Sequence, residues 1–122
     1  LIETWLVTQI GYGWDEVHDE AEVFEHSMSD RLLDAIDGQL GQPDRDPHGD
    51  PIPGRTGTIS RPAAVLLADA PSGGRVVRIS DRDPALLRHL AAEGIGLDVE
   101  LTPQRRETLA PDALASIWVA AP

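Results

Sequence analysis

The stretch Val17–Asp30, VHDEAEVFEHSMSD, decides the fold of the first half of the chain. Its apolar residues recur at the spacing of one helix face, at Val17, Ala21, Phe24 and Met28. This pattern predicts an amphipathic helix that packs against a core. We expect Asp15 to cap the start of the helix, and the helix to run to about Met28.

A second face of the same helix carries side chains that bind metals. Each helical residue advances by about 100°, which brings four polar residues onto one face: His18, Glu22, Glu25 and His26. A solvated face with Glu–His pairs is one interpretation. The other interpretation is a bound divalent cation. No Lys or Arg lies between Asp15 and Asp30, so a cation would relieve the repulsion among the acidic side chains.

The spacing of the two histidines limits how these ligands can group. His18 and His26 are about 12 Å apart along the helix axis, too far to share an ion with bonds near 2 Å. Glu22, Glu25 and His26 can meet at one ion, whereas His18 needs partners from elsewhere. The face therefore predicts two neighbouring half-sites.

Two more helices are expected beside this one. Residues 1–10 have a helical apolar pattern that Gly11 and Gly13 end. Because this helix has no N-cap and the sequence starts at Leu1, we expect the chain to be a fragment. Ser29 is a suitable cap for a third helix that ends near Gly38 or Gly41.

The second half of the chain has a different character. After a Pro-, Gly- and Asp-rich stretch over residues 42–58, a β-type run covers Arg75–Ile79. Asp83, Pro84 and Gly94 are typical start and stop residues of a short helix. LDVEL (97–101) alternates like a strand, and ALASIWV (113–119) is a candidate for another. We therefore expect an α+β chain with two modules.

Composition excludes several function classes. The 122 residues carry 21 acidic and 10 basic side chains, a formal net charge of −11, so this chain is not expected to grip a phosphate backbone by itself. There is no cysteine, hence no disulfide or thiolate metal site. No apolar run is long enough for a membrane span. The metalloprotease and di-iron motifs, Gly-rich phosphate loops and nucleophile elbows are also absent, and we expect no enzyme and no small-molecule substrate.

GYGWDEVHDEAEVFEHSMSDRLLDAI (11–36), followed by DPHGDPIPG (46–54), resembles the diphtheria toxin repressor family of metal-dependent transcriptional regulators. The resemblance covers about residues 1–54, and implies a helical dimerisation and metal-binding domain over residues 1–41. It also implies a linker over residues 42–60 and a small SH3-like (FeoA-like) β-barrel over residues 61–122. The segments that resemble this barrel domain are GRVVRISD, LLRHLAAEGI and LASIWV. A complete barrel of this kind would have another hairpin where only TPQRRET (102–108) is present, so the second module is expected either to be reduced or to lack residues in this sequence.

The resemblance assigns ligands to both half-sites. Glu3 and His18 match two ligands of the family's ancillary site, whose third, a histidine, would lie just before the first residue. Glu25 and His26 match the regulatory site, and Glu22 stands where iron-responsive members have cysteine and manganese-responsive members have glutamate. The last regulatory ligand would come from an N-terminal winged-helix domain that is absent from these residues.

An all-oxygen and nitrogen ligand set suits Mn²⁺, with Fe²⁺ as the alternative. The resemblance implies a cytoplasmic homodimer, with an interface formed by the third helix and Trp5 or Trp14, that binds operator DNA through the winged-helix domain. A plain intramolecular core is an equal alternative for the apolar residues of that helix. A free-standing metal-binding or interaction module is the alternative for the whole chain.

Four further polar residues are expected to be structural. His48 is interpreted as a loop residue and His89 as a surface or packing residue. Asp81 and Asp83 are expected to serve turns and caps first, although the SH3-like domain of some family members adds ligands to the ancillary site.

Overall fold

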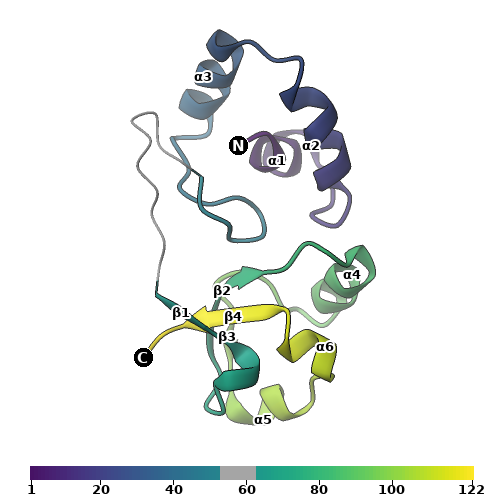
Figure 1. Cartoon of the computed structure of the whole chain (residues 1–122), viewed down its shortest axis with the longest axis vertical. Helices are drawn as coiled ribbons and strands as arrows, with labels where there is room; N and C mark the ends of the chain where they lie inside the picture. Colours follow the sequence, from purple (N-terminus) through teal and green to yellow (C-terminus); the bar gives the residue numbers. More distant parts are fainter. Residues whose placement is uncertain (53–62) are drawn as a thin grey trace. The chain divides into compact units, whose positions relative to one another are not determined.

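The computed structural model describes residues 1–52 and 63–122, and the chain divides into two compact units, residues 1–60 and 61–122 (Figure 1). Part of the predicted linker, residues 53–60, lies outside the described residues, as do Arg61 and Pro62. The first unit contains helix α1 (Ile2–Trp5), π-helix η1 (Leu6–Ile10), α2 (Val17–Glu25) and α3 (Asp30–Gln39).

The first unit is built around the start of the chain. A small core joins its helices through five buried side chains: Ile2, Leu6, Val17, Ala21 and Ile36. The predicted first helix is present, but its second half is a π-helix. It ends at Gly11, as expected, because that residue takes a left-handed conformation with φ of 90°.

Helix α2 differs from the prediction at both ends. Its N-cap is Glu16, not Asp15, and no side chain caps it. The helix ends at Glu25, three residues before Met28, with His26 as the C-cap. Phe24, predicted to face the core, is 38% exposed. The other members of the predicted stripe do lie against the core: Val17 and Ala21 are buried in it, and Met28, beyond the end of the helix, packs against it.

Helix α3 begins where the sequence predicts. The Ser29 hydroxyl accepts a hydrogen bond from the backbone N–H of Leu32 at 3.2 Å, which satisfies one of the free donors of the first turn. The helix ends at Gln39, and Gly41 beyond it has a positive φ of 76°. Of its apolar residues, Ile36 is buried and Leu32 is 47% exposed.

A tight loop follows α3 and contains no helix or central strand in its described part, as predicted. Arg45 and Pro51 form an isolated antiparallel bridge. Between them, one carboxylate oxygen of Asp46 accepts hydrogen bonds from the backbone N–H groups of His48 and Asp50, both at 2.9 Å. This turn fixes the backbone of His48.

The second unit is a four-stranded antiparallel sheet with the order β1-β4-β2-β3 (Figure 1). Its elements are, in chain order, β1 (Ala64–Leu66), 3-10 helix η2 (Leu67–Asp69), β2 (Gly74–Ile79), α4 (Pro84–Ala92), β3 (Glu100–Leu101), α5 (Pro103–Glu107), α6 (Pro111–Leu114) and β4 (Ile117–Ala120). Strand β4 pairs with both β1 and β2, so the last strand of the chain lies inside the sheet, between these two strands. The expected α+β fold is confirmed.

Some elements of this unit follow the sequence prediction closely, and others do not. Asp83 caps α4 by accepting from the N–H groups of Ala85 and Leu86 at 3.0 and 3.3 Å. The predicted strand LDVEL shrinks to two residues, and ALASIWV starts inside α6. Between β3 and β4, where a complete barrel would have the further hairpin that this sequence lacks, the chain forms α5 and α6, each of which starts with proline at its first turn. Across residues 1–52 and 63–122, no helix is both long and apolar enough to cross a bilayer.

Candidate metal centre

Packing of α1 on α2 brings the two predicted ancillary ligands together. Ile2 on α1 and Val17 on α2 are both buried in the shared core, and the residues that follow them, Glu3 and His18, lie side by side. Glu3 Oε1 is 3.3 Å from His18 Nδ1. Two ligand atoms that share an ion with bonds of about 2.1 Å are separated by about 3 Å, so this oxygen–nitrogen pair fits a divalent metal ion.

The three predicted regulatory ligands are not gathered in the same way. Glu22, Glu25 and His26 are all exposed, and their ligand atoms do not all lie within 4.8 Å of one another. Glu22 Oε1 lies 3.6 Å from Nε2 of His18, one helical turn away. This is the simple i, i+4 pair of a solvated helix face. The regulatory triad therefore stays a prediction.

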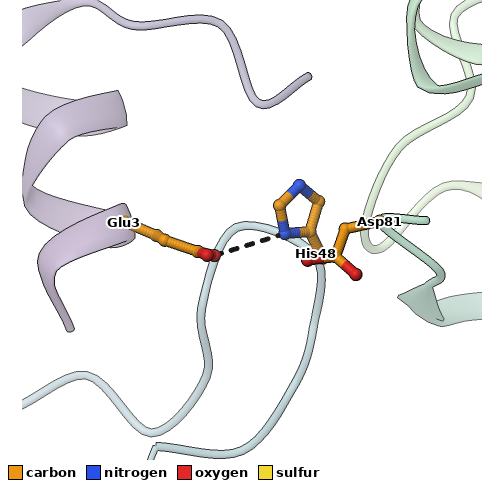
Figure 2. A group of neighbouring side chains, drawn as sticks. All are labelled: Glu3, His48 and Asp81. Carbon is orange, nitrogen blue, oxygen red and sulfur yellow. Dashed lines mark ion pairs between the residues drawn. The ribbon is translucent and has the colours of Figure 1, made fainter. Parts of the chain in front are cut away.

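His48 is placed against Glu3, which the sequence did not predict. Its ring is fully buried and lies parallel to the indole of Trp14, with centroids 5.9 Å apart and an interplanar angle of 20°. Nε2 donates a hydrogen bond to the backbone carbonyl of Trp14 at 2.7 Å, and Nδ1 faces Glu3 Oε2 at 3.5 Å (Figure 2). Its only sequence signal was the PHG element of the family resemblance, which does not specify a partner.

Charges around Glu3 hold it in the form that binds metal. The neighbouring His48 side chain lowers the pKa of Glu3 more than burial raises it, and His18 adds to the lowering. For His48, burial alone would lower the pKa, but the Glu3 carboxylate, the Trp14 carbonyl and Asp46 outweigh it and raise the pKa above its ordinary value. At 3.5 Å the Glu3–His48 contact is longer than an ordinary hydrogen bond, so its attraction is mainly electrostatic.

The remaining candidates lie in the second unit. Asp83 acts as a helix cap, as predicted. Asp81, the third residue labelled in Figure 2, follows strand β2, and its predicted role in a turn stays a prediction. His89 is exposed on α4, in agreement with its interpretation as a surface residue.

Comparisons with known proteins agree with these features. The family described as "Iron dependent repressor, metal binding and dimerisation domain" matches residues 1–54. The iron-dependent repressor IdeR of Mycobacterium leprae (strain TN) is 32% identical over 125 residues, which cover 96% of this chain and 51% of that protein. The chain thus spans about half the length of this relative.

Solved structures extend the likeness to the whole described fold. A manganese-dependent transcriptional repressor in complex with manganese is 47% identical, with a TM-score of 0.90, and the match covers 99% of this chain and 66% of that one. A second structure of a manganese-dependent transcriptional repressor, also 47% identical, has a TM-score of 0.86 and 76% of its chain covered. The chain therefore belongs to the diphtheria toxin repressor family of metal-dependent regulators.

Proposed function

We propose that this chain is the metal-sensing and dimerising portion of a cytoplasmic manganese- or iron-dependent transcriptional repressor of metal homeostasis. The observation that supports it best is the Glu3–His18 pair, which joins α1 to α2 at a distance suited to one ion. An ion bound there would tie together two helices that pack on a shared apolar core. Metal binding would thereby be coupled to the conformation of this unit.

Manganese is the proposed effector, with Fe²⁺ as the alternative. Carboxylate oxygens and imidazole nitrogens suit Mn²⁺ and Fe²⁺, while a thiolate would favour softer metals. Relatives of both kinds support this choice, because one is described as iron-dependent and two solved structures as manganese-dependent. In the proposed regulatory site, Glu22 supplies a carboxylate together with Glu25 and His26.

Homodimer formation is supported by apolar side chains on the surface of the first unit. The exposed large hydrophobic residues of the described chain all belong to it: Ile10, Val23, Phe24 and Leu32. Covering such side chains is a common reason for association. Leu32 remains a candidate from the predicted α3 interface, whereas Ile36 is buried in the core of its own unit, Trp5 packs against that core and Trp14 stacks on His48. Phe24→Asp should therefore reduce the mass measured by light scattering to that of one chain.

Operator DNA would be bound through a winged-helix domain outside these 122 residues. Residues 1–60 contain 13 acidic and 3 basic side chains, a balance that repels a phosphate backbone. The metal would act by binding the DNA-competent conformation more tightly than the other conformation. The resulting shift in the conformational equilibrium could be no larger than the difference between these two metal affinities. The alternative, a free-standing metal-binding module, predicts metal binding with no effect on DNA affinity in the protein with its upstream segment.

Calorimetric titration with Mn²⁺ tests the metal proposal directly. Glu3→Gln should remove binding at the ancillary site, and His26→Gln should remove binding at the regulatory site. His89→Gln, an exposed histidine far along the sequence, serves as the matched control and should leave both unchanged. Equal binding in all four proteins would contradict the proposal.

A further inference from the structure

We propose that a cavity in the second unit binds a small organic phosphate, a phosphate monoester whose attached group is apolar. The cavity has a volume of about 430 Å³, and the described residues that line it all belong to this unit. Among them are two arginines, two serines and a tryptophan: Arg78, Arg82, Ser80, Ser116 and Trp118. The inference does not depend on the proposed metal-sensing function, because no candidate ligand of the first unit takes part in it.

An irregularity in the pairing of β2 with β4 places Arg78 beside Trp118. Val76 pairs with Val119 and Arg78 pairs with Trp118, so Val77 is an extra residue on β2. Both valines are buried, and the arginine that follows them is exposed. Strict alternation along a strand would put Arg78 on the buried face of Val76. The extra residue turns it outward instead, as β-bulges commonly do beside functional sites.

The two arginines are suited to hold a phosphate group. The guanidinium of Arg78 lies over the ring of Trp118, 4.6 Å from the ring centroid. Stacking uses the flat face of a guanidinium, whereas hydrogen bonds to an oxyanion use the N–H groups in its plane, so the two contacts are compatible. Arg82 is exposed in the turn between β2 and α4 (Figure 1). Guanidinium groups bind phosphate through paired N–H donors, and two of them favour a doubly charged anion.

The two serines fix the wall of the cavity and add one donor. The backbone N–H of Ser80 donates to the carbonyl oxygen of Ser116 at 2.8 Å, which joins the turn after β2 to the start of β4. The Ser80 hydroxyl oxygen accepts from the backbone N–H of Arg82 at 3.4 Å, a contact that leaves its own hydrogen to be donated to an anion. The Ser116 hydroxyl donates to the carbonyl oxygen of Asp112 at 2.8 Å, so it shapes the wall without supplying a donor.

One carboxylate, that of Asp83, also lines the cavity. Its Oδ1 accepts hydrogen bonds from the backbone N–H groups of Ala85 and Leu86 at 3.0 and 3.3 Å, at the positive end of α4. These bonds offset its negative charge, and two arginines face it in the same lining. The cavity is therefore a positive region in a chain whose formal net charge is −11.

The apolar part of the lining indicates what the phosphate is attached to. Leu86 is 8% exposed and Trp118 is half-buried, and both line the cavity. An apolar group on the phosphate would pack against these two side chains. A concave site of this volume suits a small molecule, whereas the phosphates of duplex DNA are diesters on a convex surface. These features favour a small phosphate monoester over a nucleic acid.

Two-dimensional ¹H–¹⁵N NMR of the 122-residue chain in metal-free buffer tests the inference. The chain has three tryptophans, and Trp118→Phe identifies the indole signal of Trp118. The probes are inorganic phosphate, phenyl phosphate and a DNA duplex at the same phosphate concentration, with chloride used to hold the ionic strength constant. Arg82→Gln removes one guanidinium from the cavity. Arg75→Gln is the matched control, because Arg75 is an exposed arginine of β2 that pairs with Asp98 and does not line the cavity.

Phenyl phosphate should bind saturably, shift the indole signal of Trp118 and the backbone signals of Ser80 and Arg82, and bind more tightly than inorganic phosphate. Its Kd should rise at least about tenfold in Arg82→Gln and stay nearly unchanged in Arg75→Gln. Arg78→Gln should weaken binding to a similar extent and serves as the second test, with signal dispersion reporting whether each variant is folded.

Two results would overturn the proposal: no saturable shift at these residues, or equal weakening by Arg82→Gln and Arg75→Gln. Larger shifts with the DNA duplex than with phenyl phosphate would also overturn it, and would assign the two arginines to a nucleic acid. None of these results bears on Mn²⁺ binding by the first unit, which the calorimetric titration tests separately.

Discussion

Replacement of Glu3 by glutamine is the sharpest test of how metal binding stabilises the first unit. Gln keeps the size of the side chain but removes the charge that faces His18 and His48. A ligand that binds only the folded state stabilises it by about 2.7 kcal/mol when present at 100 times its Kd. If the substitution weakens Mn²⁺ binding about 100-fold, the same concentration adds only about 0.4 kcal/mol. The loss of metal-dependent stability is therefore about 2.3 kcal/mol.

Urea unfolding with Mn²⁺ or with EDTA measures this difference. Trp5 and Trp14 lie in the first unit and Trp118 in the second, so a Trp118→Phe background makes the fluorescence report on the first unit alone. His89→Gln in the same background should retain the full Mn²⁺ effect. An equal Mn²⁺-dependent gain in Glu3→Gln and in the control would refute the assignment of Glu3 as a ligand.

Three further outcomes are expected. Glu22→Cys should move the metal response from Mn²⁺ toward Fe²⁺ or Co²⁺ because a thiolate is softer than a carboxylate; an unchanged ranking in metal titrations would count against a role for Glu22. Gly73→Ala should lower the free energy of urea unfolding by about 1–3 kcal/mol, because Gly73 has φ of 72° and an added Cβ would lie 2.0 Å from a backbone oxygen. Gly38→Ala, at a position on α3 with open space around it, should raise that free energy by about 0.5–1 kcal/mol. In EDTA, the free energy of unfolding of the first unit should fall as pH rises through the raised pKa of His48. The folded state favours the protonated ring, so its stabilising contribution is complete below the unfolded pKa near 6.5 and is lost above the folded pKa. An unfolding free energy that does not change between pH 5 and 8 would contradict this.

Local signals in the sequence predicted those elements whose ends depend on nearby residues. Ser29 and Asp83 each cap a helix through hydrogen bonds to residues two or three positions later. The incorrect predictions depend on distant contacts. Phe24 continues the apolar stripe of α2, yet it is 38% exposed, whereas Val17, Ala21 and Met28 of the same stripe lie in or against the core. The strand predicted over LDVEL is only two residues long, because β3 pairs with β2 at Glu100 and Leu101 alone.

The same distinction between local and distant contacts applies to the candidate site. Helical periodicity alone placed His18 and Glu22 on one face, and they lie 3.6 Å apart, because a helix sets the spacing of residues one turn apart. The approach of His48 to Glu3 and Trp14 spans 45 and 34 positions of the chain, and depends on the turn around Asp46 and on the burial of the ring. Sequence by itself indicated the family, the helix faces and the kinds of side chain at the candidate site. Only the tertiary structure decided which carboxylate and which imidazoles meet, because packing between distant segments sets those distances.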